Sequence, residues 1–282
     1  MKGAFEFMDQ QVLFAFLLTL FAGISTGIGS IIAFFSKRTN TSFLCVSLGF
    51  SAGVMIYVSF VEMFPESLAL FSRLYPARLA ATYTTLSFFG GILLIALIDK
   101  FIPQRENPHE IHGVEELVQP EGTKSNGVSS LKEHKLLRVG LFTALILVIH
   151  NFPEGMVTFL SGMQDIRVAL PIAFAIAIHN IPEGISVSVP IFYATGNRKK
   201  AFWLSFLSGL AEPLGALFGY LILAPYLNDT VYGIIFAAIA GIMVYISLDE
   251  LLPAAEEYGL HHQAIYGLIS GMLVMAVSLL IL

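Results

Sequence analysis

The stretch IHNFPEGM, Ile149–Met156, lies inside a long apolar segment, and the next apolar segment repeats it as IHNIPEGI, Ile178–Ile185. Histidine, asparagine and glutamate are costly in apolar surroundings, and proline is a poor residue for the interior of a helix. Any account of the fold therefore has to explain why this chain places the same polar cluster in apolar sequence twice.

The composition around these stretches is that of a membrane protein. Hydrophobic residues make up 56% of the 282 residues, charged residues make up 12%, and the mean hydropathy is +0.78. A soluble domain carries about 25% charged residues. The net charge of −5, with acids spread thinly, offers no basic surface for nucleic acid. A single cysteine, Cys45, excludes an intramolecular disulfide and a thiolate zinc cluster.

Eight apolar segments have the length of about 20 residues with which a helix crosses a bilayer. They are Val12–Phe35, Ser42–Val61, Leu79–Ile98, Val139–Met163, Val168–Val189, Ala201–Leu223, Thr230–Leu248 and Gln263–Leu282. The first is too long for the core of a signal peptide and lacks a convincing cleavage site. The sequence predicts an all-α membrane protein, with eight transmembrane helices in a single domain over residues 1–282.

Lysine and arginine concentrate in the loops after the first, third and fifth spans, which the positive-inside rule places in the cytoplasm. Both termini are therefore expected outside, in a multi-pass protein of the plasma (inner) membrane. The long polar segment at about residues 103–135 has the composition of a flexible cytosolic loop. Its three histidines, His109, His112 and His134, are either solvated or metal-binding.

Other parts of the chain repeat as well. Ala52–Pro65 matches Ala240–Pro253 at a constant offset, and GISTGIG, Gly23–Gly29, weakly echoes GLAEPLG, Gly209–Gly215. Related spans lie an odd number of crossings apart, so they run in opposite directions. We predict inverted repeats, with helices 1–3 related to helices 6–8 and helix 4 related to helix 5. Such repeats are typical of secondary transporters, whereas a duplicated passive scaffold does not explain repeated His and Glu.

Each copy of the opening motif places three ligand-type residues on one helix face, because a helix turns by about 100° per residue. They are His150, Asn151 and Glu154 in the first copy, and His179, Asn180 and Glu183 in the second. Pro153 and Pro182 cannot hydrogen-bond to the carbonyl one helical turn earlier. We expect each helix to kink there and to free a carbonyl oxygen beside the cluster.

Glu212, in the sixth span, adds a third buried carboxylate, and no lysine or arginine lies at a comparable depth. Because each ionised group at the bilayer centre costs at least about 2.5 kcal/mol, a divalent cation is the expected partner. Imidazole, carboxylate and amide ligands suit Zn²⁺, Fe²⁺, Mn²⁺ or Co²⁺ and argue against a dedicated Mg²⁺ or Ca²⁺ site. The alternative is that His and Glu, one helical turn apart, only hydrogen-bond within the bundle.

Further carboxylates lie toward the helix ends, where they form an entrance and an exit or serve only as solvated caps. Glu62 and Glu66 fall near the outer end of the second span, and Asp249 and Glu250 near the inner end of the seventh. His261 and His262 follow in the last inner loop and are candidate acceptors of the metal at the exit. Glycine-rich faces such as Gly90–Gly91 can support helix contacts within the chain or in a homodimer.

The motifs HNFPEG and HNIPEG, with AEPLGA on the next span, resemble the ZIP (Zrt-, Irt-like) family of divalent metal transporters. The segment DKFIPQRENPHE, Asp99–Glu110, is similar to the bacterial ZupT-type branch. This resemblance covers all eight spans and implies uptake of Zn²⁺, and also of Fe²⁺, Mn²⁺ and Co²⁺, into the cytoplasm. It implies two bound metals: one held by His150, Glu154, His179 and Glu183, the other by Asn151, Asn180 and Glu212, with Glu154 and Glu183 bridging.

Two other functions stay open, an intramembrane metallohydrolase and a metal exporter on the same scaffold. The zinc-protease pattern H-E-x-x-H is absent, and the chain offers no separate general base or nucleophile. We therefore expect no enzyme, with metal ions as cargo of an alternating-access transporter rather than as a catalytic cofactor.

Overall fold

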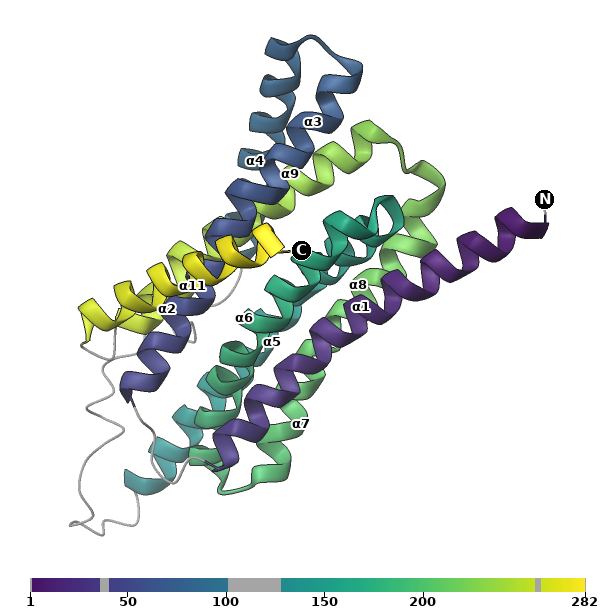
Figure 1. Ribbon diagram of the computed structural model, residues 1–282. Helices are drawn as coiled ribbons and strands as arrows, with labels where there is room; N and C mark the ends of the chain where they lie inside the picture. The colour runs from purple at the N-terminus through teal and green to yellow at the C-terminus, as the bar shows by residue number, and fades with distance from the viewer. Residues whose placement is uncertain (1, 36–40, 101–127, 257–259, 282) are drawn as a thin grey trace.

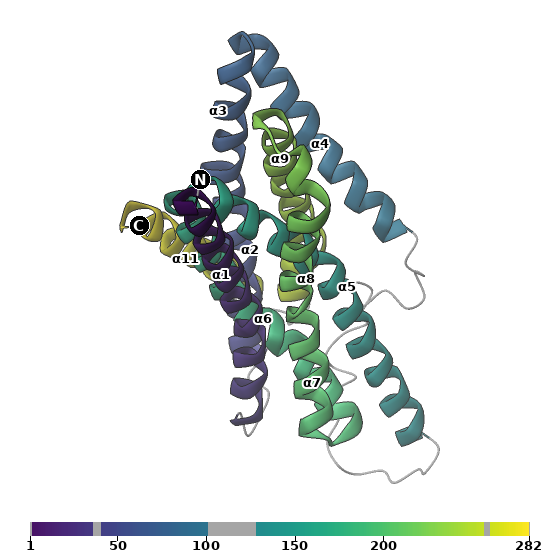
Figure 2. The same cartoon turned by 90° about the vertical axis from the view of Figure 1, so that its right-hand side faces the viewer.

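The computed structural model is a bundle of long helices (Figures 1 and 2), and it describes residues 2–35, 41–100, 128–256 and 260–281. No strand occurs among these residues. The helices are α1 (Lys2–Phe35), α2 (Thr41–Val58), α3 (Phe64–Leu74), α4 (Ala77–Lys100), α5 (Val128–Gln164), α6 (Ile166–Thr195), α7 (Arg198–Gly209), α8 (Ala211–Phe218), α9 (Asp229–Ile246), α10 (Leu252–Glu256) and α11 (His261–Ile281).

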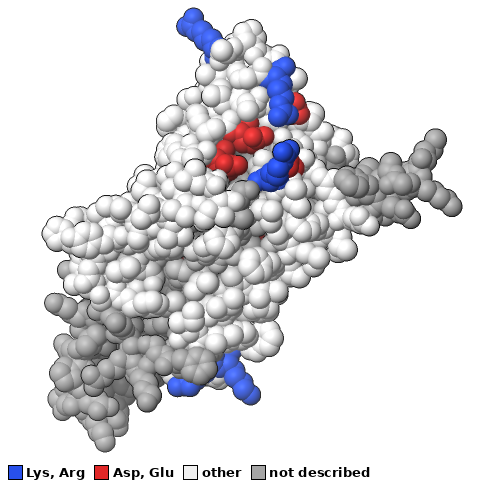
Figure 3. Space-filling view, viewed as in Figure 1, with Lys and Arg blue, Asp and Glu red and all other residues white. Residues whose placement is uncertain are grey.

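Seven stretches of the described chain are long and apolar enough to cross a membrane, which confirms an all-α membrane protein. The remaining expected span, Val139–Met163, lies within α5, but the side chains of several of its residues are outside the described part. The number eight therefore stays a prediction. Figure 3 agrees with a membrane setting, because charged residues gather toward the two ends of the visible face and leave an uncharged middle.

The observed helix ends follow local chemistry. The Asp165 side chain accepts a hydrogen bond from the backbone of Arg167 at the start of α6, and Asn197 and Asn228 cap α7 and α9 in the same way. Gly196 ends α6 in the left-handed conformation that glycine adopts without strain. The turns at Asp165 and Gly196 keep α5 beside α6 and α6 beside α7.

Two boundaries differ from the expectation. Helix α5 begins at Val128, inside the segment about 103–135 that we expected to be a loop, because its last residues include good helix formers such as Leu131 and Lys132. The rest of that loop, with His109 and His112, lies outside the described residues, as does the side chain of His134. Helices α5 and α6 run continuously through Pro153 and Pro182, and the kinks stay a prediction.

The second span continues well past Val61, to Leu74, through a π-helical segment at Ser59–Met63. The seventh span continues likewise to Glu256 through a π-helical segment at Ser247–Leu251. The two segments occupy equivalent positions in the repeated sequence. Each precedes a proline, Pro65 or Pro253, and the wider π-turn lets the helix continue where a proline would normally end it.

The helices form two groups (Figures 1 and 2). One group contains α1, α5, α6, α7 and α8, which pack mainly on one another. The other contains α2, α3, α4, α9, α10 and α11, in which α2 packs on α11 and α4 packs on α9. The groups meet mainly where α2 lies against α6. The Ser51 hydroxyl donates a 3.4 Å hydrogen bond to the carbonyl oxygen of His179 at that seam.

Glycines mark the places where helix backbones approach most closely. A Cβ atom on Gly29 would clash with the carbonyl oxygen of Ile181, and one on Gly215 with that of Phe152. The other clashes of this kind include Gly53 with Leu268, Gly241 with Phe88, Gly91 with Ala238, and Gly271 with Phe50. Small residues allow such approaches between helices in a membrane.

These close contacts occur in matched pairs. Gly29 and Gly215 are the last residues of the two copies of the weak repeat. Gly29 contacts Ile181 and Gly215 contacts Phe152, and these two contacted residues are equivalent positions of the opening motif. Gly91 contacts Ala238 of α9, and Gly271 contacts Phe50 of α2. Phe50 and Ala238 are separated by the same offset that relates the second span to the seventh. Packing at the closest points therefore agrees with the predicted inverted repeats.

Adjacent glycines of α4 give a test of this packing. Gly91→Ala should destabilise the fold by about 1–3 kcal/mol, because the new methyl group meets the backbone of α9 at Ala238. Gly90→Ala is the matched control, since nothing lies within 4 Å of its Cβ position. It should be neutral or stabilise by up to about 1 kcal/mol through helix propensity. Thermal unfolding in detergent measures both, and equal melting temperatures would contradict the contact.

Candidate metal centre

The seven predicted ligand residues all lie in the interior of the bundle. His150, Asn151 and Glu154 come from α5, His179, Asn180 and Glu183 from α6, and Glu212 from the first turn of α8. Each is at most 2% exposed. The elements that carry them belong to one helix group, so this centre is built within a single packed unit.

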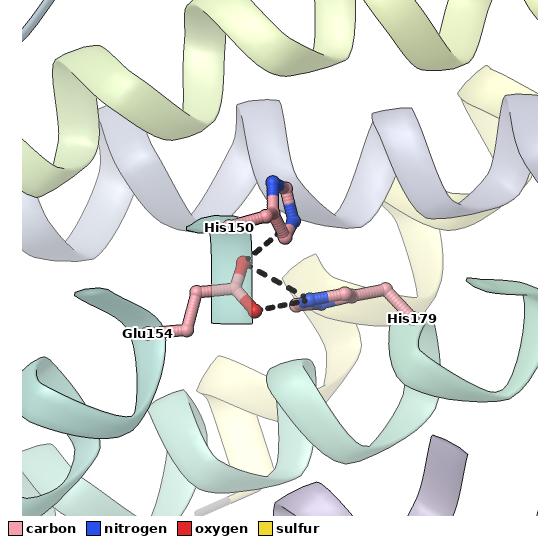
Figure 4. Close-up of side chains that lie close together, drawn as sticks. All are labelled: His150, Glu154 and His179. Carbon is pink, nitrogen blue, oxygen red and sulfur yellow. Dashed lines mark hydrogen bonds and ion pairs between the residues drawn. The ribbon is translucent and has the colours of Figure 1, made fainter. Parts of the chain in front are cut away.

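Four of the seven side chains converge. Glu154 lies between the two imidazoles (Figure 4), with its Oε1 atom 3.2 Å from Nε2 of His150 and 3.2 Å from Nε2 of His179. Glu183 approaches from the other helix, with Oε1 3.2 Å from His150 Nε2 and 4.0 Å from His179 Nε2. His150, Glu154 and His179 each place a ligand atom within 4.8 Å of the others, close enough to share one metal ion.

The orientation of His179 suits metal binding. Its Nδ1 lies 3.0 Å from the carbonyl oxygen of Ala175, to which a protonated Nδ1 donates a hydrogen bond. That bond leaves the lone pair on Nε2, the atom that faces the carboxylates. A metal-binding histidine is commonly held in this way by a hydrogen bond from its other ring nitrogen.

Glu212 and Asn180 form a second part of the centre. The Asn180 amide donates to the Glu212 carboxylate and, at 2.9 Å, to the carbonyl oxygen of Ala22. Asn151 instead turns its amide toward α7 and donates to the Ser208 carbonyl oxygen at 3.3 Å. The structure thus brings Asn180 and Glu212 together, whereas no hydrogen bond links Asn151 to a carboxylate within the described chain.

Several ligand-type atoms of the centre have no hydrogen-bond partner in the described part of the chain. They include Glu183 Oε2, Glu212 Oε2, the Oδ1 atoms of both asparagines and Nδ1 of His150. Buried polar atoms normally have partners. A set of carboxylate, amide and imidazole atoms left in this state fits the donor set of a divalent cation.

A small cavity lies beside His150, at the C-terminal end of α4. His150 lines it together with Asp99 and Glu250, and apolar side chains complete the wall. The sequence predicts Glu250 as an exit residue, whereas Asp99, which follows directly after an apolar span, carries no local signal for such a role. Only the packing of α4 on α9 shows that these carboxylates lie along one cavity.

The other predicted polar residues lie away from the ligand cluster. Glu66 accepts a hydrogen bond from Gln164 Nε2 at 3.2 Å, and Glu62 is half-buried. Because the second span continues to Leu74, both glutamates lie more than two helical turns before its end, and the prediction that they fall near that end is wrong. Asp249 is exposed beside Glu250. His261 is exposed and lies 2.7 Å from Glu256, with its ring near that of His262. None of these positions reaches the seven ligands directly in the described contacts.

Comparison with known proteins gives a consistent identification. The family model described as ZIP Zinc transporter matches residues 9–279. The chain is 62% identical to zinc transporter ZupT of Streptococcus mutans, over 97% of this chain and 99% of that protein. It is 59% identical to zinc transporter ZupT of Clostridium perfringens, with 96% of each chain covered. The chain therefore belongs to the ZIP zinc transporter family.

Proposed function

We propose that this chain carries divalent metal ions, zinc among them, across a membrane into the cytoplasm. The observation that carries the proposal is the cluster of Glu154, Glu183, His150 and His179, whose ligand atoms converge in a buried site. Its relatives are named zinc transporters, and members of this family are transporters rather than enzymes.

One metal ion is bound by the four converging side chains. Glu154 and Glu183 supply oxygen, and His150 and His179 supply nitrogen, a mixed set that suits Zn²⁺ and also Fe²⁺, Mn²⁺ and Co²⁺. A second ion is held beside it by Asn151, Asn180 and Glu212, with Glu154 and Glu183 bridging. The pairing of Asn180 with Glu212 in the structure supports this second position.

Carboxylates toward the two ends of the bundle extend the path. Glu62 and Glu66 receive metal from outside, while Asp99, Asp249 and Glu250 receive it on the cytoplasmic side. The cavity shared by His150, Asp99 and Glu250 supports the inner half of this route. His261 and His262 lie beyond it as later acceptors.

Transport proceeds by alternating access, with one helix group moving against the other. All seven ligands belong to the group formed by α1 and α5–α8, which meets the second group mainly along α2 and α6. The inverted repeats, supported by the paired glycine contacts and the paired π-helical segments, make an outward-open and an inward-open state related by symmetry.

The α6–α7 turn, with Arg198, Lys199 and Lys200, faces the cytoplasm, and both termini lie outside. A homodimer stays a prediction. Gly91 is already used within the chain against α9, while the neighbouring Gly90 has open space beside it.

Replacing the central carboxylates tests the site. Glu154→Gln and Glu183→Gln should each lower zinc affinity by at least about 100-fold, because a direct ligand contributes more than an outer partner. Zinc binding is measured by calorimetry on the purified protein and uptake in proteoliposomes. Asp229→Asn, an exposed carboxylate 3.8 Å from Arg73, is the control and should behave as wild type. Wild-type transport by both Gln variants would refute the assignment.

The direction of transport is tested in the same vesicles. Inserted in one known orientation, wild-type protein should accumulate zinc on the side of the Arg198–Lys200 turn when the gradient favours that side. Net movement only toward the opposite side would identify an exporter. Peptide cleavage without metal movement would indicate a hydrolase.

Metal binding should weaken as the pH falls, because His150 and His179 bind metal only as neutral imidazoles. Metal ions and protons compete for the same imidazole nitrogens, so the neutral forms become scarcer as the pH falls. Each proton displaced on binding makes the apparent affinity fall by about tenfold per pH unit in the acid range. Calorimetry in two buffers with different ionisation enthalpies counts the protons, and a pH-independent affinity between about pH 5 and 7 would contradict this ligand set.

The inner carboxylates should affect release rather than binding. Asp99→Asn and Glu250→Gln are expected to lower the initial rate of zinc uptake by about tenfold, if each lost carboxylate ligand costs about 1.4 kcal/mol along the path. The equilibrium zinc affinity of the central site should change far less. Asp229→Asn again serves as the control, and unchanged uptake rates in both variants would exclude an exit role.

A further inference from the structure

Thr26 of α1 occupies the position that the inverted repeat relates to Glu212. Gly23 and Gly29 flank it at the same spacing with which Gly209 and Gly215 flank Glu212. Sequence alone shows the weak match of GISTGIG with GLAEPLG. Thr26 has a hydroxyl where Glu212 has a carboxylate. The two residues can have related roles only if both lie beside the metal centre.

Backbone packing places the two residues equivalently. A Cβ atom on Gly155 would clash with the backbone of Glu212, and one on Gly184 would clash with the backbone of Thr26. Gly155 directly follows the ligand Glu154, and Gly184 directly follows Glu183. Each residue therefore lies against the helix turn that carries one of the two central glutamates.

The two asparagines follow the same relation. Asn180 donates to the carbonyl oxygen of Ala22, and Asn151 donates to that of Ser208, the residue that the repeat relates to Ala22. Asn180 in addition reaches Glu212. By symmetry the partner position for Asn151 is Thr26, whose side chain is shorter. Asn151 Oδ1 and Thr26 Oγ1 are both left without a hydrogen-bond partner among the described residues.

The side chain of Thr26 points toward the turn that Asn151 also contacts. Its Oγ1 atom lies 2.7 Å from the Cβ position of Gly209, the residue after Ser208. Thr26 and Asn151 are each 0% exposed. Both oxygens thus lie deep in the bundle, where α1 and α5 meet the end of α7.

A purely structural role does not account for the Thr26 hydroxyl. Other buried threonines have a partner: Thr84 pairs with Ser67 at 3.5 Å, while Thr19 donates to the carbonyl of Ala15 at 3.0 Å and Thr158 to that of Glu154 at 2.9 Å, one helical turn earlier. For Thr26 that carbonyl belongs to Ala22, which already accepts hydrogen bonds from Asn180 and Ser25. A carbonyl oxygen has two lone pairs, so the usual bond is not available to Thr26.

We propose that Thr26 and Asn151 form an uncharged oxygen subsite for the second divalent cation of the centre, opposite the Asn180–Glu212 pair to which the repeat relates them. The subsite rests on the proposed metal centre and explains two buried oxygens that lack partners among the described residues. Neutral hydroxyl and amide oxygens are hard ligands, which favour Mn²⁺ over Zn²⁺. Thr26 therefore helps to determine which ions the centre accepts, and the missing charge makes its two halves unequal.

Thr26→Val removes the hydroxyl at nearly constant volume. Mn²⁺ affinity of the purified full chain, followed by the electron paramagnetic resonance signal of free Mn²⁺, should fall by about tenfold, as for loss of other supporting groups at metal sites. Zn²⁺ affinity, held by the imidazoles, should change by less than about threefold. Thr26→Ser should retain both affinities.

Thr19→Val is the matched control, since Thr19 is also buried in α1 but bonds to its own helix. It should leave both affinities unchanged. If Thr26→Val binds Mn²⁺ like wild type while Glu154→Gln does not, the subsite is refuted and the metal centre stands. If wild type binds neither Mn²⁺ nor Zn²⁺, the proposed function fails, and the subsite fails with it.

Exchanging the two residues tests their equivalence. Glu212→Thr should weaken Mn²⁺ binding, and the added substitution Thr26→Glu should restore it, because each position lies against the helix turn of a central glutamate, at Gly155 or Gly184. Gel filtration and thermal melting establish that both proteins are folded. A folded double variant without recovery would show that the positions are not equivalent and would overturn the proposal.

Discussion

Three carboxylates buried among apolar helices are the constraint on which this structure depends. Glu154, Glu183 and Glu212 lie at most 1% exposed, and ionised groups are costly at such depth. Two imidazoles and an amide approach them, and the ion pairs of the described chain bring no lysine or arginine to them. The bundle therefore gathers carboxylates at one buried place, and in the proposed function a divalent cation neutralises them. Because no described lysine or arginine is paired with these carboxylates, an entering cation does not have to displace a positively charged side chain.

Close helix packing is what holds this site together. Gly155 lets α8 approach α5 beside Glu154, and Gly184 lets α1 approach α6 beside Glu183. A side chain at either glycine would push the neighbouring helix away by more than the tolerance of a metal–ligand bond. The same glycines make the two halves of the centre symmetric in backbone while leaving them different in side chains, with Glu212 on one side and Thr26 on the other. Gly155 and Gly184 therefore determine the symmetric backbone, whereas Glu212 and Thr26 determine the difference in side-chain chemistry.

In the proposed function, the remaining helices supply an entrance and an exit route. The second and seventh spans each pass a proline by way of a π-helical segment, and each carries a carboxylate in that segment, Glu62 or Glu250. This device keeps the span continuous and places an acidic group at a widened turn. Asp99 lines one cavity with Glu250 and His150. All seven proposed ligands belong to one of the two helix groups. In the proposed alternating-access mechanism, one group moves against the other.

The sequence by itself determined the class of protein and the ligand types. Apolar segments of bilayer length and the repeated His, Asn and Glu are local features, so their periodicity places them on one helix face without further information. Only the tertiary structure decided that Asn151 turns to Ser208 rather than to a carboxylate, that Asp99 shares a cavity with His150, and that Thr26 lies against the helix turn of Glu183. Those relations join residues far apart in the chain, and they depend on how closely glycine backbones let neighbouring helices pack.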